Sequence, residues 1–230
     1  MTDLSVPVPD PVHASDETLL SSLTGMVEHP AYPCVGGKAA FHQKQATVRV
    51  YEGLGSDAAT FALAEDLREF ARTGPIDESF VSFVAIFRGP TIVDEEHFER
   101  LLWRQLSRLA RQDGTQWNGD VSSDPTDHHF GFSLFGVAYF VVGLHPQASR
   151  DARRAGSPVL VFNPHRQFER LRNQERYVRM RDVIRRRDQR LQGTINPMVR
   201  DHGTESEARQ YAGRPVEPTW EPPEWIEPGS

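Results

Sequence analysis

Three apolar runs rich in β-branched and aromatic residues constrain the fold more than any other feature of this sequence. They are SFVSFVAIFRGP (79–90), FGFSLFGVAYFVVGLH (130–145) and SPVLVFNPH (157–165). Runs of this composition are typical of strands that are buried in a sheet. A further strand is predicted from TVRVYEGLG (47–55), where Val48 and Val50 share one face. The sequence therefore predicts a β-sheet at the core, with each long apolar run forming one strand.

Helical patterns separate these runs. Helices are predicted at 16–26, 57–73, 94–114, 166–192 and within 203–213. The 57–73 helix has an apolar stripe formed by Phe61, Leu63, Leu67 and Phe70. Because strands and helices do not alternate in regular β-α-β units, we expect an α+β fold, with a mostly antiparallel sheet and packed helices in a single domain.

The chain ends differ from this central part in composition. Residues 1–14 are predicted to be a disordered lead-in, and residues 15–212 the folded domain. The segment 213–230 is rich in proline and tryptophan, so we expect it to be extended or disordered unless Trp220 and Trp225 dock. Within the domain, HPAYPCVGGKAAF (29–41) is predicted to be a shaped loop.

Charge and composition exclude several classes of protein. The net charge of -6 argues against a general binder of nucleic acid or of membrane surfaces. Every basic residue except Lys38 and Lys44 is an arginine, and Cys34 is the single cysteine, so no intrachain disulfide is possible. The N-terminus lacks the pattern of a signal peptide, and the longest apolar run is too short to span a bilayer. We therefore expect a soluble, cytoplasmic protein.

Two histidines stand at the ends of the best predicted strands, and these are the strongest candidates for chemistry. His145 and His165 each terminate an apolar run and each neighbours a proline, so a rigid scaffold would hold both rings. Either one could be a hydrogen-bonded structural residue, a metal ligand or an acid–base group. If the two strands form an antiparallel hairpin, the histidines lie at opposite ends and a single site cannot easily use both.

Charged residues surround both histidines. The turn arginines Arg150, Arg153 and Arg154 have the forked donors that match carboxylates or phosphates near His145. Glu169, one helical turn after His165, is placed to orient that imidazole or to pair with a cation.

Three further groups are weaker candidates. Asp127, His128 and His129 could bind a metal, but consecutive side chains of an extended segment point to opposite faces, which favours a solvated loop. Cys34, before two glycines, could act as a nucleophile or metal ligand, or simply be a small buried residue. The segment with Asp201, His202, Glu205, Glu207 and Arg209 could be a buried polar network, a substrate clamp or a solvated cap. Common nucleotide, hydrolase and zinc-protease motifs are absent from the sequence.

Several of these segments together resemble the YqcI/YcgG family, whose members are also described as FPC/CPF motif-containing proteins. The matching segments are Tyr32-Pro33-Cys34, the strand 83–90, the LLW of the second long helix, GLHP (143–146) with Ser149, Arg150, Arg153 and Arg154, the block 162–172 and the block 201–214. The sequence departs from the family pattern near its end, where TWEPPEW stands in place of the expected CPF motif. The second cysteine is therefore missing, which lowers the expectation that Cys34 is catalytic.

The resemblance implies a haem-dependent enzyme that hydroxylates a nitrogen of an amine or guanidine substrate similar to arginine, in a biosynthetic pathway. It would use dioxygen, or peroxide, with electrons from an external donor. In that interpretation His165 or His145 is the axial ligand of the iron, and Arg150, Arg153, Arg154 and Cys34 contact the cofactor. Glu169 and His145 are the catalytic candidates, and Asp201, Glu205 and Glu207 would bind the substrate. The alternative is a non-haem enzyme or binding protein that recognises a small anion through the strand-end histidines and arginines.

Overall fold

A computed structural model describes Leu4, Val8, Asp10 and residues 11–73, 80–168, 176–194 and 205–226. Within these residues a five-stranded sheet has the strand order β1-β2-β5-β4-β3. The strands are β1 (Ala46–Gly53), β2 (Ser82–Gly89), β3 (Phe132–Leu134), β4 (Val137–Leu144) and β5 (Val159–Pro164). The pairs β2–β5, β5–β4 and β4–β3 are antiparallel, which confirms the predicted α+β fold with a mostly antiparallel sheet.

One edge of the sheet departs from this pattern. Strands β1 and β2 are parallel, and the helix α3 (Asp57–Thr73) connects them, so the chain contains one β-α-β unit. A parallel pair requires a long crossover, which α3 supplies. Strands and helices do not alternate regularly along the whole chain, so the sequence pattern did not reveal this single β-α-β unit.

The predicted strand 130–145 is wrong as a single element, because the chain reverses at Phe135-Gly136. Both residues have positive φ angles, 51° and 75°, as a tight two-residue hairpin between β3 and β4 requires. A phenylalanine rarely adopts this conformation. Here the Phe135 amide donates to Asp113 Oδ2 at 2.6 Å, and the Arg68 guanidinium lies 4.5 Å above the Phe135 ring. Tertiary contacts thus stabilise a turn that could not be predicted from the apolar sequence.

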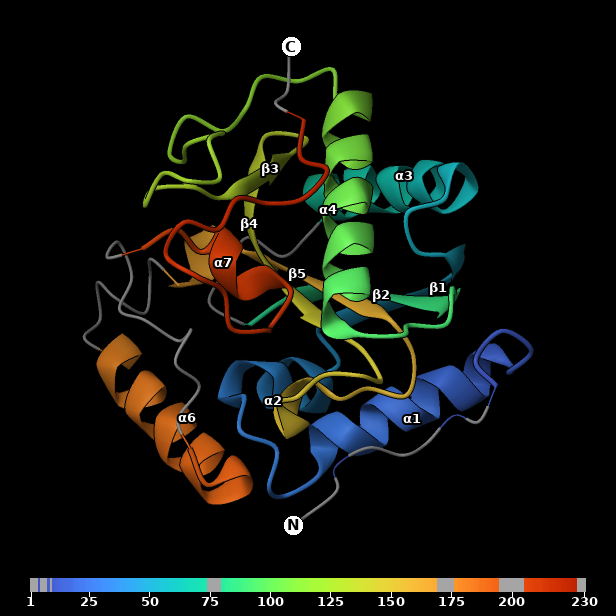
Figure 1. The fold of residues 1–230 in the computed structure, drawn as a ribbon, viewed down its shortest axis with the longest axis vertical. Coiled ribbons are helices and arrows are strands. Elements are labelled where there is room, and N and C mark those ends of the chain that lie inside the picture. The colour runs from blue at the N-terminus through green and yellow to red at the C-terminus, as the bar shows by residue number, and fades with distance from the viewer. Residues whose placement is uncertain are drawn as a thin grey trace.

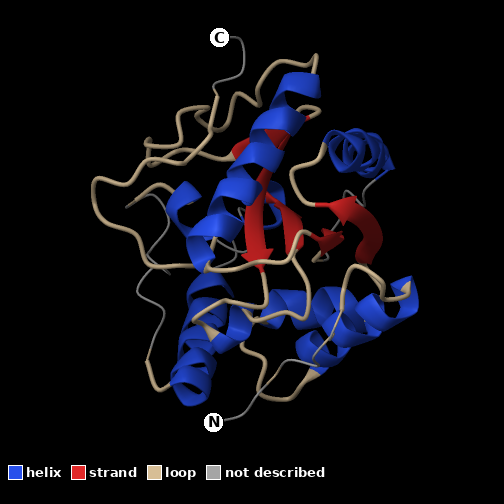
Figure 2. Ribbon diagram, turned by 45° about the vertical axis from the view of Figure 1, so that its right-hand side comes forward, coloured by secondary structure: helices blue, strands red, loops and turns tan. Residues whose placement is uncertain are grey.

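Helices cover both faces of the sheet, and each face has its own core (Figures 1 and 2). One core joins Phe83 and Phe87 of β2 to α3 and to α4 (Glu95–Gln112). The other joins Val84 and Ile86 to α1 (Asp16–Glu28) and to Leu4 and Val8 of the N-terminal segment. Alternate side chains of a strand point to opposite faces, which explains why a continuous apolar run is needed in β2.

Two local predictions need correction. The segment 29–41 is irregular only up to Cys34, because α2 (Val35–His42) begins there despite its two glycines. Cys34 is the N-cap of this helix, and its Sγ atom accepts a hydrogen bond from the Gly37 amide at 3.3 Å. Phe61 has the correct helical phase but 64% of its surface is exposed, because the buried face of α3 is centred on Leu63 and Leu67.

The C-terminal part of the chain packs on both sides of the sheet, because the Arg-rich helix contacts α2 and the segment from residue 208 onward joins the α4-side core. The Arg-rich segment is helical at 165–168 and again in α6 (Arg176–Gln192), whereas 169–175 lie outside the described residues. The short helix α7 (Ala208–Tyr211) follows, and then Trp220 and Trp225 dock on Trp103 of α4. No helix in the described part of the chain is long and apolar enough to cross a membrane.

Candidate functional site

A cavity of about 280 Å³ lies on the α2 side of the sheet and is lined by segments far apart in the sequence. Its walls come from the start of α2, the strands β2, β4 and β5, the 3-10 turn η1 (Asp151–Arg153), α6 and the residues before α7. Apolar side chains form much of this wall, including Tyr32, Phe80, Phe140, Val142, Leu144, Phe168, Met180 and Ile184. Its polar side chains include Cys34, Arg150, Arg153, Asn163, His165, Glu205 and Glu207. Six of the residues predicted for the site therefore share one cavity.

His165 is the imidazole of this cavity. It follows β5 directly, and its Nε2 atom lies 2.9 Å from Oε1 of Glu207. Among the described residues Nδ1 of His165 has no hydrogen-bond partner, and it is not one of the fully buried polar atoms. A carboxylate that holds one ring nitrogen fixes the orientation and tautomer of the ring and leaves the other nitrogen for a ligand.

A third residue extends this pair. The Tyr211 hydroxyl donates to Oε1 of Glu207 at 2.5 Å and is also 3.2 Å from the Phe132 amide. Burial, followed by the nearby Glu207 charge, raises the pKa of Tyr211 well above its ordinary value, so the hydroxyl stays protonated and donates. The residues Tyr211, Glu207 and His165 thus form a continuous hydrogen-bonded chain from the core to the cavity.

These hydrogen bonds indicate a different role for Glu207 from the one that the sequence suggested. Glu207 was predicted to bind substrate, and Glu169 was predicted to orient His165. The partner of His165 among the described residues is Glu207, whereas Glu169 lies outside them. Sequence reasoning missed Tyr211, although its position four residues after Glu207 places both on one face of a short helix.

Cys34 lines the cavity from the start of α2. Burial raises the pKa of its thiol, while the Gly37 amide and the Arg153 charge act in the opposite direction. A free thiol is therefore the expected form at neutral pH, and a cation or metal bound beside it would favour the thiolate.

The three predicted anion-binding arginines differ in their surroundings. Arg150 is 8% exposed and is held by Asp188 at 2.5 Å and by Thr194, and Arg154 pairs with Asp151 at 2.9 Å. Arg153 instead donates to the carbonyl oxygens of Gly143, Tyr211 and Gln210. Within the described residues no carboxylate lies at ion-pair distance from Arg153, so its charge is the least neutralised of the three cations.

His145 does not line the cavity. Its ring is 0% exposed and stacks on Phe98 of α4, with ring centroids 4.2 Å apart. Neither ring nitrogen has a hydrogen-bond partner among the described residues, and burial, aided by the Arg153 charge, lowers the pKa of His145 to about 3. The antiparallel pairing of β4 with β5 confirms that His145 and His165 lie at opposite ends of the hairpin. The structure therefore separates the two axial-ligand candidates, and only His165 lies at the cavity.

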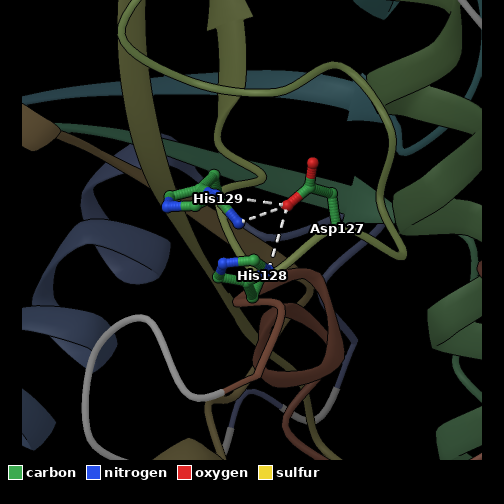
Figure 3. A group of neighbouring side chains, drawn as sticks. All are labelled: Asp127, His128 and His129. Atoms are coloured by element: carbon green, nitrogen blue, oxygen red, sulfur yellow. Dashed lines mark hydrogen bonds and ion pairs between the residues drawn. The ribbon is translucent and has the colours of Figure 1, made fainter.

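The remaining candidates are distributed as follows. Glu205 lines the cavity and lies 3.8 Å from the Arg209 guanidinium, whereas Asp201 and His202 are outside the described residues. His128 also contributes to the cavity lining. The prediction that His128 and His129 point to opposite faces is wrong, because their ring centroids are 3.9 Å apart (Figure 3). The segment is a turn and not an extended strand, which brings both rings to one side of Asp127.

Comparison with known proteins supports the family resemblance. Two proteins of Bacillus subtilis (strain 168) are similar to this chain: YcgG is 29% identical over 164 residues and YqcI is 26% identical over 162 residues. These alignments cover 65% and 68% of this chain and 64% of each relative, so the chain matches less than two thirds of their length. No solved structure matches. The model of the YqcI/YcgG family matches residues 23–224, and the chain belongs to this family.

Proposed function

We propose that this protein is a haem-dependent oxygenase that hydroxylates a nitrogen of an amine or guanidine substrate similar to arginine. The observation that carries the proposal is the cavity itself, which combines an apolar wall with His165, Cys34 and the cation Arg153. Haem sites require an iron ligand, an apolar slot and cationic partners for the propionates.

The donor set of the cavity fits an iron porphyrin. Two side chains offer iron ligands: the His165 imidazole, held by Glu207, and the Cys34 thiol, which accepts an amide hydrogen bond. Imidazole and thiolate are both established axial ligands of haem, and hydrogen bonds to them tune the iron. Arg153 supplies a half-buried cation without a carboxylate partner in the described structure, as a propionate group requires. Bound haem would supply oxygen activation, with electrons from an external donor.

The other polar residues have roles that do not depend on the cofactor. Glu205 lines the cavity and offers a carboxylate to a guanidinium or ammonium group. Glu207 orients the His165 ring, and Tyr211 in turn holds the Glu207 carboxylate. The apolar wall from β4 and α6 limits water around a bound substrate, which strengthens these polar contacts.

A second candidate function has one specific observation in its favour. The described residues enclose about 280 Å³, close to the lower end of small-molecule sites, and Arg153 contributes a cation to a largely apolar lining. A small carboxylate or phosphate would satisfy this cation directly. The alternative is thus a non-haem protein that binds or converts a small anion.

A visible absorption spectrum of the purified protein tests the first proposal. After expression with haem supplementation we expect a Soret band, and we expect the variant His165→Ala or the variant Cys34→Ser to lose it. A ferrous carbon monoxide complex separates the two ligands, because thiolate ligation shifts its absorption to longer wavelength. His145→Leu is the control and should retain the band. A colourless protein after haem supplementation would exclude the haem proposal, and anion-dependent stabilisation that Arg153→Gln abolishes would then establish the alternative.

Glu207→Gln examines the His165–Glu207 pair separately. The amide retains the size of the side chain but removes the charge, so we expect haem affinity to fall about 10- to 100-fold if His165 ligates iron. The position of the Soret band and the iron reduction potential should shift as well, which a merely structural role would not produce. Glu205→Gln is the matched control, because Glu205 lines the same cavity without contacting His165. Equal effects of both substitutions would contradict a positioning role for Glu207.

A further inference from the structure

The turn Asp127-His128-His129 gathers three side chains with metal-ligating atoms at the rim of the cavity. One ligand atom of each residue lies within 4.8 Å of the others, the only such group found in the described part of the chain. Figure 3 shows the Asp127 carboxylate directed between the two imidazoles. Nδ1 of His128 is 3.4 Å from Oδ1 of Asp127, and Nδ1 of His129 is 3.5 Å from the same oxygen.

These separations match the spacing of ligands around a tetrahedral metal ion. Zinc binds histidine nitrogen and carboxylate oxygen at about 2.0–2.2 Å, so two ligands of a tetrahedron are roughly 3.3–3.5 Å apart. Direct hydrogen bonds between a ring nitrogen and a carboxylate are shorter, at about 2.7–3.2 Å. Both distances therefore fit pairs of ligands that share one ion better than they fit direct hydrogen bonds between the side chains.

The backbone of the turn holds this arrangement before any metal binds. The His129 amide donates to Oδ1 of Asp127 at 2.8 Å, and the Phe130 amide donates to the Asp127 carbonyl at 3.0 Å. The hydrogen bond from the His129 amide is also the main reason that the pKa of Asp127 is lowered, so the carboxylate is ionised at neutral pH. A turn of this kind fixes ligand directions at little cost in chain entropy on binding.

The exposure of the two imidazoles and the types of ligand atom indicate which ion could bind. The side chains of His128 and His129 are 55% and 68% exposed, so an ion can enter from solvent. Two imidazoles and one carboxylate favour zinc, nickel or copper over magnesium and calcium, which prefer oxygen ligands. Three protein ligands leave one tetrahedral position for water or for an anionic group of a bound molecule.

We propose that Asp127, His128 and His129 form a binding site for a divalent transition metal ion of the zinc type, at the rim of the cavity that His128 also lines. The site is independent of the haem proposed at His165. Because its ligands are exposed and adjacent in sequence, the ion is exchangeable and is not part of the folded core.

Zinc titration of the untagged full-length protein, followed by calorimetry and by metal analysis after dialysis, tests this site. Asp127→Asn, His128→Ala and His129→Ala should each weaken one zinc site per chain by about tenfold or more, since even outer partners of metal sites contribute 10- to 100-fold.

His13→Ala is the matched control, because His13 is also exposed and lies 2.7 Å from a carboxylate, that of Asp10. Zinc affinity should be unchanged in His13→Ala and also in His165→Ala. Circular dichroism should show that the variants at Asp127, His128 and His129 fold, since both imidazoles are exposed and the turn lies outside the core. If His13→Ala weakens binding as much as His128→Ala, or if Asp127→Asn leaves the affinity unchanged, binding is adventitious and the site does not exist.

Discussion

Individual buried polar residues carry unusual electrostatic costs in this fold. His145 and Arg153 interact electrostatically, because the Arg153 charge contributes to the lowered pKa of His145. The His145 amide also donates to the Arg153 carbonyl at 2.9 Å, which fixes the turn between β4 and β5. The backbone of this turn is therefore well satisfied, whereas the His145 ring is not.

His145→Leu tests the cost of that ring. The folded state keeps His145 neutral down to about pH 3, whereas the unfolded chain takes up a proton near 6.5. The unfolded state thus binds one more proton between these values, so stability decreases as pH falls through 6.5. The slope is about 1.4 kcal/mol per pH unit. We expect the leucine variant to lack this component and to be at least as stable as the wild type at pH 7, because an unpaired buried polar group is removed.

Urea unfolding at pH 7, 6 and 5 measures this difference. The gap between His145→Leu and the wild type should widen in favour of the variant as the pH falls. His42→Leu, at an exposed position on α2, should follow the wild type. Parallel stability curves for the wild type and His145→Leu would show that the folded state also protonates the ring, so that the ring is not sealed from solvent.

At the scale of elements, α4 packs tightly against β4 at Gly143. A Cβ atom at Gly143 would lie 2.6 Å from the Phe98 ring and 2.9 Å from Leu102. Glycine in a strand weakens the strand itself, and its presence here is explained by the helix that packs on it. The same packing stacks the Phe98 ring on His145, which follows Gly143 by two residues and comes directly after β4.

Gly143→Ala should therefore destabilise the protein by about 2–3 kcal/mol, near the upper end of overpacking costs, because ring atoms and not flexible chain ends must move. Gly119→Ala is the control, since a Cβ atom there would meet nothing within 4 Å. Chemical denaturation of the two variants gives the comparison. Similar midpoints would mean that α4 can shift away from β4 without loss of packing.

At the scale of the whole molecule, the C-terminal segment completes the core on the α4 side. Trp225 contacts Trp103, Trp117 and Phe130, and Trp220 donates to Glu99 Oε1 at 3.0 Å. The buried Glu99 also pairs with Arg214 at 2.6 Å. Removing this segment would expose aromatic surface and leave a buried carboxylate without its partners, which is costly.

Trp225→Ala should lower the free energy of unfolding by about 2–3 kcal/mol, less than for a fully buried tryptophan because the side chain is half-buried. For a domain of this size that corresponds to a decrease of roughly 5–10 °C in Tm. Ile226→Ala, next in sequence and 40% exposed, should change Tm little. A small effect of Trp225→Ala in differential scanning calorimetry would show that the segment is not part of the cooperative unit.

Local sequence patterns predicted those features that depend on one helix or one strand alone. The helix starts predicted at residues 16 and 94 agree to within one residue with α1 and α4, whose N-caps are Ser15 and Asp94. The sequence left open whether β4 and β5 form an antiparallel hairpin, and the structure shows that they do, which places His145 and His165 at opposite ends. The turn at Phe135-Gly136 was not, because a run of apolar residues gives no sign of positive φ angles that distant residues stabilise.

The sequence by itself determined the fold class, the main helices and strands, and which residue types are available for chemistry. Tertiary structure alone decided that Cys34, Arg153, His165 and Glu207 share a cavity, while His145 is sealed against α4. Periodicity reports which face of an element is apolar, but not which distant element covers it. The partner of His165 is 42 residues away in the chain, and only the packing of α7 against the sheet brings the two side chains together.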